Sequence, residues 1–244
     1  MIKVNNNSIV KSFCETNKIP TLNLVGMLKN NDNYELYVDN INEIRGILFR
    51  MRYWNILFSE NEEFISNIIT DFKGRNEIGF AGVMSKYFHI IKEKYEIDWE
   101  EKCYLYYLDD IKELANNNYE LRKLESDHAE IVNKYYTYKD EYSLEYIKEC
   151  IEKRPTSAVF VNDEPVSWVL TREDGTLGLM YTIDEYRRKG LAKIVTVDLA
   201  KKVIENGDTP FVHIAVNNKA SIKLAESNGF KRYGEVYWFG IKNA

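Results

Sequence analysis

The order of apolar and polar positions along the chain predicts short strands and amphipathic helices that follow one another. Helices are indicated where apolar residues recur every three or four positions, and strands where β-branched and aromatic residues run together. In the first half, the pattern predicts strands at residues 22–28, 34–38, 53–58 and 103–108, and helices at 62–72 and 84–95.

The second half shows the clearer pattern, and it begins after a polar segment at residues 109–118. Three consecutive asparagines close this segment, and asparagine favours turns, so we place a domain boundary there. We therefore expect two domains, at residues 1–118 and 119–244. The expected strands of the second domain are residues 119–124, 157–161, 165–171, 176–183, 211–216 and 230–241, and its expected helices are 127–138, 143–153, 188–205 and 218–227.

Composition and charge narrow the class of protein. The 244-residue chain has 45% hydrophobic and 29% charged residues with only 4 Pro, which is typical of a globular protein. A net charge of −5 gives no broad basic surface for a polyanion, so we expect no nucleic-acid partner. The first ten residues lack a signal peptide's apolar segment, and no stretch is apolar enough to span a bilayer. We expect a cytoplasmic protein with no membrane partner.

The cysteines and histidines predict neither a disulfide framework nor a metal site. Cys14, Cys103 and Cys150 are odd in number and far apart, so we expect reduced, buried thiols. His89 and His128 have no Cys or second His at ligand spacing, so we expect no metal.

A basic segment between a predicted strand and a predicted helix is the main candidate for chemistry. Arg187, Arg188 and Lys189 come directly before Gly190. The N-terminus of a helix presents unpaired N–H groups and partial positive charge, and glycine lets a phosphate approach the backbone without a Cβ in the way. The segment therefore predicts an anion site; a solvated charged loop is the alternative when the segment is taken alone.

The spacing Arg187-x-x-Gly190-x-Ala192 resembles the coenzyme A pyrophosphate loop of the GNAT acyl-CoA N-acyltransferase superfamily. Roughly thirty residues later, Asn218–Ser221 and then Gly229 stand where that superfamily has its second motif. The resemblance implies an α+β fold, with a mixed sheet flanked by helices.

A narrower resemblance is to the glycine N-acyltransferase branch, through Pro165-Val-Ser-Trp168 followed by Tyr181-Thr182, Glu185-Tyr186-Arg187 and His213. The resemblance covers about residues 119–244. In that branch a degenerate copy of the fold precedes the catalytic domain, which implies a degenerate GNAT-like domain at 1–118. There, Gly79–Gly82 precedes a predicted helix but lacks a basic residue, so we expect a tight helix-entry turn.

The resemblance also implies an activity and a set of binding residues. It implies transfer of an acetyl or other small acyl group from acetyl-CoA or another acyl-CoA to a primary amine of a small molecule or amino acid, by direct attack in a ternary complex without a metal. A homodimer is one expectation for the assembly. The residues implied to hold the coenzyme are Met180, Tyr181, Thr182, Arg187, Arg188, Lys189, Gly190, Leu191, Ala192, Lys193, Asn218 and Ser221.

The proton-transfer residues of the family do not carry over. Ala225 stands where many members have a tyrosine, and Thr176 stands where the glycine acyltransferase branch has a glutamate. These two departures also motivate an alternative function, a non-catalytic acyl-CoA-binding or regulatory module.

Local side chains are the remaining candidates for moving a proton. We expect His213 to be catalytic because its strand lies beside the expected cleft and its pKa suits proton transfer near neutral pH; a packed histidine is the alternative. Tyr181 is the candidate donor to the leaving thiolate. Glu173 and Asp174 are candidates at the turn before Thr176, or else solvated turn residues.

Overall fold

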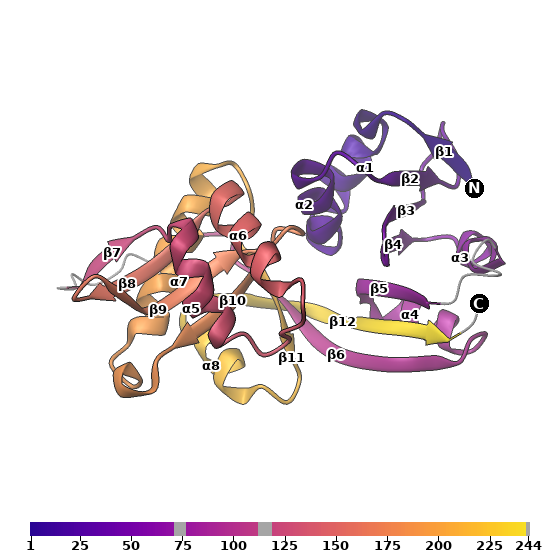
Figure 1. Ribbon diagram of the computed structural model, residues 1–244. Helices are drawn as coiled ribbons and strands as arrows, with labels where there is room; N and C mark the ends of the chain where they lie inside the picture. Colours follow the sequence, from indigo (N-terminus) through magenta and orange to yellow (C-terminus); the bar gives the residue numbers. More distant parts are fainter. Residues whose placement is uncertain (71–76, 112–118, 243–244) are drawn as a thin grey trace. The chain divides into compact units, whose positions relative to one another are not determined.

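The computed structural model describes residues 1–70, 77–111 and 119–242, and the chain divides into two compact units (Figure 1). Unit 1 contains Met1–Leu105, His213–Asn218 and Arg232–Ala244, and unit 2 contains Tyr106–Val212 and Lys219–Lys231. The boundary predicted at residue 118 lies outside the described residues, and the division into domains at 1–118 and 119–244 stays a prediction. The mixture of helices and sheets confirms the predicted α+β class.

Unit 1 is built on a mixed sheet with the strand order β1-β2-β3-β4-β5-β12-β6-β11. The pair β4 and β5 is parallel, whereas β12 pairs with β5 in the antiparallel direction. Strands β6, β11 and β12 each continue past a residue at which the units divide. The strands are β1 (Ile2–Val4), β2 (Glu35–Val38), β3 (Gly46–Met51), β4 (Trp54–Ser59), β5 (Glu77–Met84), β6 (Ile97–Tyr107), β11 (Phe211–Ala215) and β12 (Lys231–Lys242).

The predicted strand at 22–28 is wrong, because this segment lies in the helix α2 (Leu22–Asn30). A short apolar run fits either period, and burial here follows the helical one: Leu24 and Met27, three positions apart, are buried, while Val25 is exposed. The other helices of this unit are η1 (Asn7–Val10), α1 (Lys11–Thr16), η2 (Ile19–Thr21), α3 (Glu62–Thr70) and α4 (Ser85–Lys92).

The strands β3 and β5 were not predicted, and the helix-entry turn expected at Gly79–Gly82 is wrong. These residues lie inside β5, where Ala81 and Gly82 together stand opposite Trp238 of β12. Two residues opposite one form a β-bulge, and Gly82 adopts the positive φ of 62° that such a bulge uses. Gly79 and Gly82 are therefore part of strand β5, and Gly82 allows its bulge to form.

Unit 2 contains an antiparallel sheet with the order β10-β9-β8-β7, made of β7 (Glu120–Arg122), β8 (Thr156–Val161), β9 (Glu164–Thr171) and β10 (Leu177–Thr182). Its helices are η3 (Ser126–His128), α5 (Ala129–Lys134), α6 (Ser143–Lys153), η4 (Asp184–Tyr186), α7 (Leu191–Glu205) and α8 (Lys219–Ser227). Trp168 of β9 is fully buried in a core shared with α5 and α6. The helix predicted at 127–138 is shorter than expected, since α5 ends at Lys134.

The same order of elements occurs twice along the chain. The series β4-α3-β5-α4-β6 in the first half matches β10-α7-β11-α8-β12 in the second. The two series differ most where the first strand leads to the first helix: residues 60–61 join β4 to α3, whereas residues 183–190 join β10 to α7. Because of this repeat, the start of α3 can be compared with the start of α7.

Candidate functional site

Strand β10 carries a bulge next to the basic loop. Gly178 pairs with Leu170 and Tyr181 with Trp168, so Leu179 and Met180 together stand opposite Val169. Leu179 has a φ of 50°, which is uncommon for a residue with a side chain. A bulge leaves an extra residue outside the hydrogen-bond ladder. Backbone groups at Met180 are therefore available to a ligand that lies along this edge strand.

The loop after β10 is folded back by its own side chains. Asp184 Oδ1 accepts a hydrogen bond from Tyr181 Oη at 3.1 Å and pairs with Arg187 Nη2 at 2.8 Å. Arg187 Nε donates to the carbonyl of Thr182 at 3.1 Å, so its guanidinium is held against the end of β10. Arg188 and Lys189 are exposed beside it.

The loop ends at Gly190, which is the N-cap residue of α7 and has a φ of 79°. Only glycine adopts this left-handed conformation without strain. A Cβ built on Gly190 would meet no atom within 4 Å, so the space above the backbone is open. Leu191, Ala192 and Lys193 form the first turn of α7, where the backbone N–H groups have no intrahelical acceptor.

The electrostatic character of this helix start favours an anion. No side chain caps α7, and its first turn holds no acidic residue. The equivalent helix start of the first half differs on both points: Asn61 Oδ1 accepts from the N–H groups of Glu63 and Phe64, and Glu62 and Glu63 occupy the first turn. Two N–H groups at the start of α3 are therefore satisfied by Asn61, and the first turn carries negative charge that repels a phosphate.

Tyr181 joins the bulged strand to a group of aromatic side chains. Its ring stacks on Tyr135 with centroids 4.5 Å apart and lies 5.8 Å from the ring of Trp168. The Arg187 guanidinium lies 5.2 Å from the same ring. Desolvation and the hydrogen bond to Asp184 raise the pKa of the Tyr181 hydroxyl. Its role as a proton donor to a thiolate stays a prediction.

The remaining predicted site residues lie in different parts of the chain. His213 and Asn218 belong to unit 1, and Ser221 belongs to unit 2 on α8. His213 Nδ1 accepts a hydrogen bond from Trp238 Nε1 at 3.2 Å. Ala225 is buried on α8, so this position supplies no polar group. The roles predicted for His213, Asn218 and Ser221 are not tested by these contacts.

The turn between β9 and β10 holds the two acidic candidates in different environments. Asp174 is buried, and its Oδ1 accepts from the N–H and the Oγ1 of Thr176 at 3.0 and 2.6 Å. Glu173 is half-buried, and burial together with the nearby Asp174 raises its pKa. The sequence alone did not separate these two carboxyl groups, nor did it contain a signal for the bulge at Leu179.

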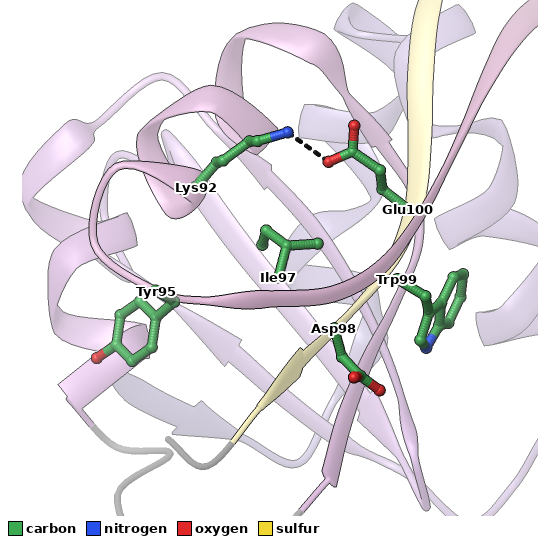
Figure 2. A pocket seen from close by; sticks show the side chains of 6 residues that line it. All are labelled: Lys92, Tyr95, Ile97, Asp98, Trp99 and Glu100. Atoms are coloured by element: carbon green, nitrogen blue, oxygen red, sulfur yellow. Dashed lines mark hydrogen bonds and ion pairs between the residues drawn. The ribbon is translucent and has the colours of Figure 1, made fainter.

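A hollow of about 350 Å³ lies in unit 1 (Figure 2). The residues that line it are distant in the sequence from β10 and the basic loop. Figure 2 shows Lys92 and Glu100 paired across it, and Asp98 pairs with Lys242. Trp99 Nε1 donates to Tyr53 Oη at 3.3 Å. Because these polar groups already satisfy one another, the hollow does not identify a ligand.

Neither a metal site nor a membrane-spanning helix is present among the described residues. Within residues 1–70, 77–111 and 119–242, no group of three His, Cys, Asp or Glu side chains is placed to hold a metal ion. In the same part of the chain, no helix has the length and apolar character needed to cross a membrane.

Comparison with known proteins finds similar sequences and structures for this part of the chain. A family model described as "FR47-like protein" matches residues 162–239, which include the bulged strand, the basic loop and α8. Human glycine N-acyltransferase-like protein 2 is 27% identical over 143 residues, covering 58% of this chain and 48% of that protein. The chain thus spans about half the length of the curated relatives it matches.

Two solved structures are similar over nearly the whole chain. A Drosophila protein has a TM-score of 0.80 at 14% identity and covers 96% of this chain and 95% of its own. A tandem GNAT protein from the clavulanic acid biosynthesis pathway has a TM-score of 0.58 at 9% identity, covering 100% and 98%. The chain is similar to proteins of the GNAT superfamily in its sequence motifs and in its fold. Its GNAT fold and its resemblance to the glycine N-acyltransferase branch confirm the two family-level expectations from the sequence.

Proposed function

We propose that this GNAT protein is an acyl-CoA-dependent N-acyltransferase whose coenzyme site lies in unit 2. The observation that carries the proposal is the uncapped start of α7, with Gly190 open above its backbone and Arg187, Arg188 and Lys189 before it. The names of the glycine N-acyltransferase relatives support this reaction class at the family level. We propose acetyl-CoA or another acyl-CoA as co-substrate, and a primary amine of a small molecule or amino acid as acceptor.

The predicted binding residues lie mainly on two elements, and each element would bind a different part of the coenzyme. Arg187 to Lys193 would hold the pyrophosphate through helix N–H groups and side-chain charge. Met180, Tyr181 and Thr182 would pair with the pantetheine amides along the free edge of β10. We keep Asn218 and Ser221 as candidates for fixing the pantetheine.

The bulge would supply the N–H donor that stabilises the reacting thioester carbonyl. Attack of a neutral amine on the thioester carbonyl places negative charge on the carbonyl oxygen, and a preorganised N–H donor stabilises that charge by about 3 kcal/mol in a site without water. We assign this donor to the backbone of β10 at Met180, because the bulge removes residues from the ladder there. The thioester would then lie beside Leu179 and Met180.

Gly190 and Gly207 provide a matched test of coenzyme binding. Both have left-handed φ values, 79° and 81°, and a Cβ at either meets no atom within 4 Å. Alanine at either position therefore carries the same backbone strain of about 1–2 kcal/mol. We expect Gly190→Ala to weaken coenzyme A binding about tenfold or more in titration calorimetry, and Gly207→Ala to leave the affinity unchanged. Equal affinities in the two folded variants would overturn the proposed site.

The alternative function, a non-catalytic acyl-CoA-binding or regulatory module, is distinguished by turnover. Release of the coenzyme thiol from acetyl-CoA would be followed with a panel of primary amines and amino acids. Thiol release that depends on the amine supports the enzyme. Tight coenzyme binding without release for any acceptor supports the module.

A further inference from the structure

An arginine side chain lies across the strand that carries the bulge. Arg172 directly follows β9, and a Cβ built on Gly178 of β10 would lie 2.8 Å from the Arg172 Cδ. Gly178 stands opposite Leu170, so these two positions share one face of the sheet. Tyr181 and Trp168 form the next pair on that face, beyond the bulge. The stem of Arg172 therefore covers β10 on the side where the aromatic group with Tyr181 lies.

Tyrosine hydroxyl groups hold the guanidinium in place. Arg172 Nε donates a hydrogen bond to Tyr146 Oη of α6 at 3.2 Å. Tyr136, in the segment between α5 and α6, interacts electrostatically with the same guanidinium. Burial raises the pKa of both hydroxyl groups, so they stay neutral beside the arginine. Arg172 is only half-buried, so a small ligand has access to it.

A guanidinium in this setting suits a ligand carboxylate. The planar fork of N–H donors matches the two oxygens of a carboxylate, and the charge strengthens the hydrogen bonds. Asp174 of the same turn interacts electrostatically with Arg172, but its Oδ1 accepts from the N–H and the hydroxyl of Thr176. The arginine thus presents a positive charge on the face of β10 rather than on an outer loop.

The bulge is within reach of a small ligand bound at Arg172. Met180 is two residues after Gly178, so at about 3.3 Å per residue their Cα atoms are at most about 7 Å apart. In an α-amino acid, one carbon atom separates the amino nitrogen from the carboxylate carbon. Such a molecule is short enough to bind Arg172 through its carboxylate with its amine at the bulge, where the proposed function places the thioester.

We propose that Arg172 binds the carboxylate of an amino-acid acceptor, so that the enzyme selects amino acids over amines without a carboxylate. This inference rests on the proposed function and names the acceptor class of the same site. Arg172 is then a specificity-determining residue. Tyr146 is a positioning residue, because its hydroxyl fixes the direction of the guanidinium through Nε.

Amino acids and their amides provide matched substrates for the test. The amide keeps the reacting amine and the side chain but replaces the carboxylate by a neutral group. The common amino acids are screened with acetyl-CoA, butyryl-CoA and octanoyl-CoA, and each amino acid that reacts is compared with its amide by kcat/KM. We expect Arg172→Met to lower the ratio of the two kcat/KM values about tenfold or more relative to wild type, with coenzyme A affinity unchanged by calorimetry.

Three further variants separate recognition from packing. Arg172→Lys keeps the charge without the planar fork and should retain part of the preference. Tyr146→Phe should lower the same ratio by a smaller factor, because the guanidinium loses its anchor. Arg122→Met is the matched control, since Arg122 lies on β7 at the opposite edge of the same sheet, and it should keep the wild-type ratio.

The outcomes distinguish failure of this inference from failure of the proposed function. Both substrates are measured on one sample, so the ratio does not depend on the fraction of folded molecules. An unchanged ratio in Arg172→Met, an equal loss in Arg122→Met, or a wild-type chain that accepts amides or plain amines as well as amino acids overturns the role of Arg172 and leaves the enzyme assignment intact. A wild-type chain that binds no coenzyme A, or transfers no acyl group to any amine, fails the proposed function itself.

Discussion

At the scale of single residues, His213 shows how one contact changes an expectation. A neutral imidazole has one nitrogen that can accept a proton, and the Nδ1 of His213 already accepts from Trp238. The ring also packs on the bulge of β5, because a Cβ at Gly82 would lie 2.5 Å from its Cε1. In this arrangement the histidine contributes packing and a hydrogen bond within unit 1.

We therefore expect His213→Asn to act mainly on stability. The loss of the ring and of the Trp238 contact should lower the free energy of unfolding by about 1–2 kcal/mol. Turnover per folded molecule should stay within about twofold of wild type. Thermal melting and thiol release, measured on one sample, check both statements; a stable variant without turnover and with normal coenzyme binding would instead establish the catalytic role first expected for His213.

At the scale of elements, the two equivalent helix starts have opposite chemistry. The helix α7 begins with Gly190 and no side-chain cap, whereas α3 begins with the Asn61 cap and two glutamates. A side-chain cap stabilises a helix but occupies the N–H groups that an anion needs. The start of α3 is therefore not suited to binding an anion, and the degenerate character expected for the first domain stays a prediction.

Removal of the cap tests the structural side of this comparison. Asn61→Ala should lower the free energy of unfolding by about 1 kcal/mol, because the N–H groups of Glu63 and Phe64 lose their acceptor. Urea unfolding followed by circular dichroism measures this change. Coenzyme A affinity should not change. A weakening of coenzyme binding in this variant would contradict the placement of the site at α7.

At the scale of the whole molecule, the last strand of the chain belongs to the first unit. Residues 236–242 of β12 pair with β5, and Phe239 stacks on Phe80 with centroids 4.7 Å apart. Tyr237 stacks on Phe88 at 4.0 Å. Each of these buried rings contributes roughly 1.5–3 kcal/mol through the hydrophobic effect. A division of the chain at residue 118 separates unit 1 from part of its own core.

This connection predicts the behaviour of fragments. Residues 1–118 alone should lack a cooperative unfolding transition, because β5 loses its pairing with β12 and the core loses the β12 rings. Mixing with residues 119–244 should restore the transition, whereas residues 119–231, which lack the unit 1 portion of β12, should not. Circular dichroism of the separate and mixed fragments measures the effect. A cooperative transition in residues 1–118 by themselves would show that β12 is dispensable.

Much of the second half follows from the sequence by itself. Apolar spacing places α6 at Ser143–Lys153 as predicted, and it places β8, β9, α7 and β12 to within a few residues. The basic loop could be located because Gly190 and the three preceding cations occur in the short segment between a strand and a helix. Each of these features depends on residues that are close together in the sequence, so it can be recognised without knowledge of the tertiary structure.

The tertiary structure decided the features that depend on distant residues. The apolar run at 22–28 fits a strand or a helix equally well, and only packing selects α2. The bulge at Leu179 has no local signal, because it depends on the register of β10 against β9. The same holds for the burial of Asp174 and for β12 in the core of unit 1. The sequence determined which chemistry the loop can support, whereas the fold decided which atoms are left free to carry it out, because burial and hydrogen bonding are set by residues far apart in the chain.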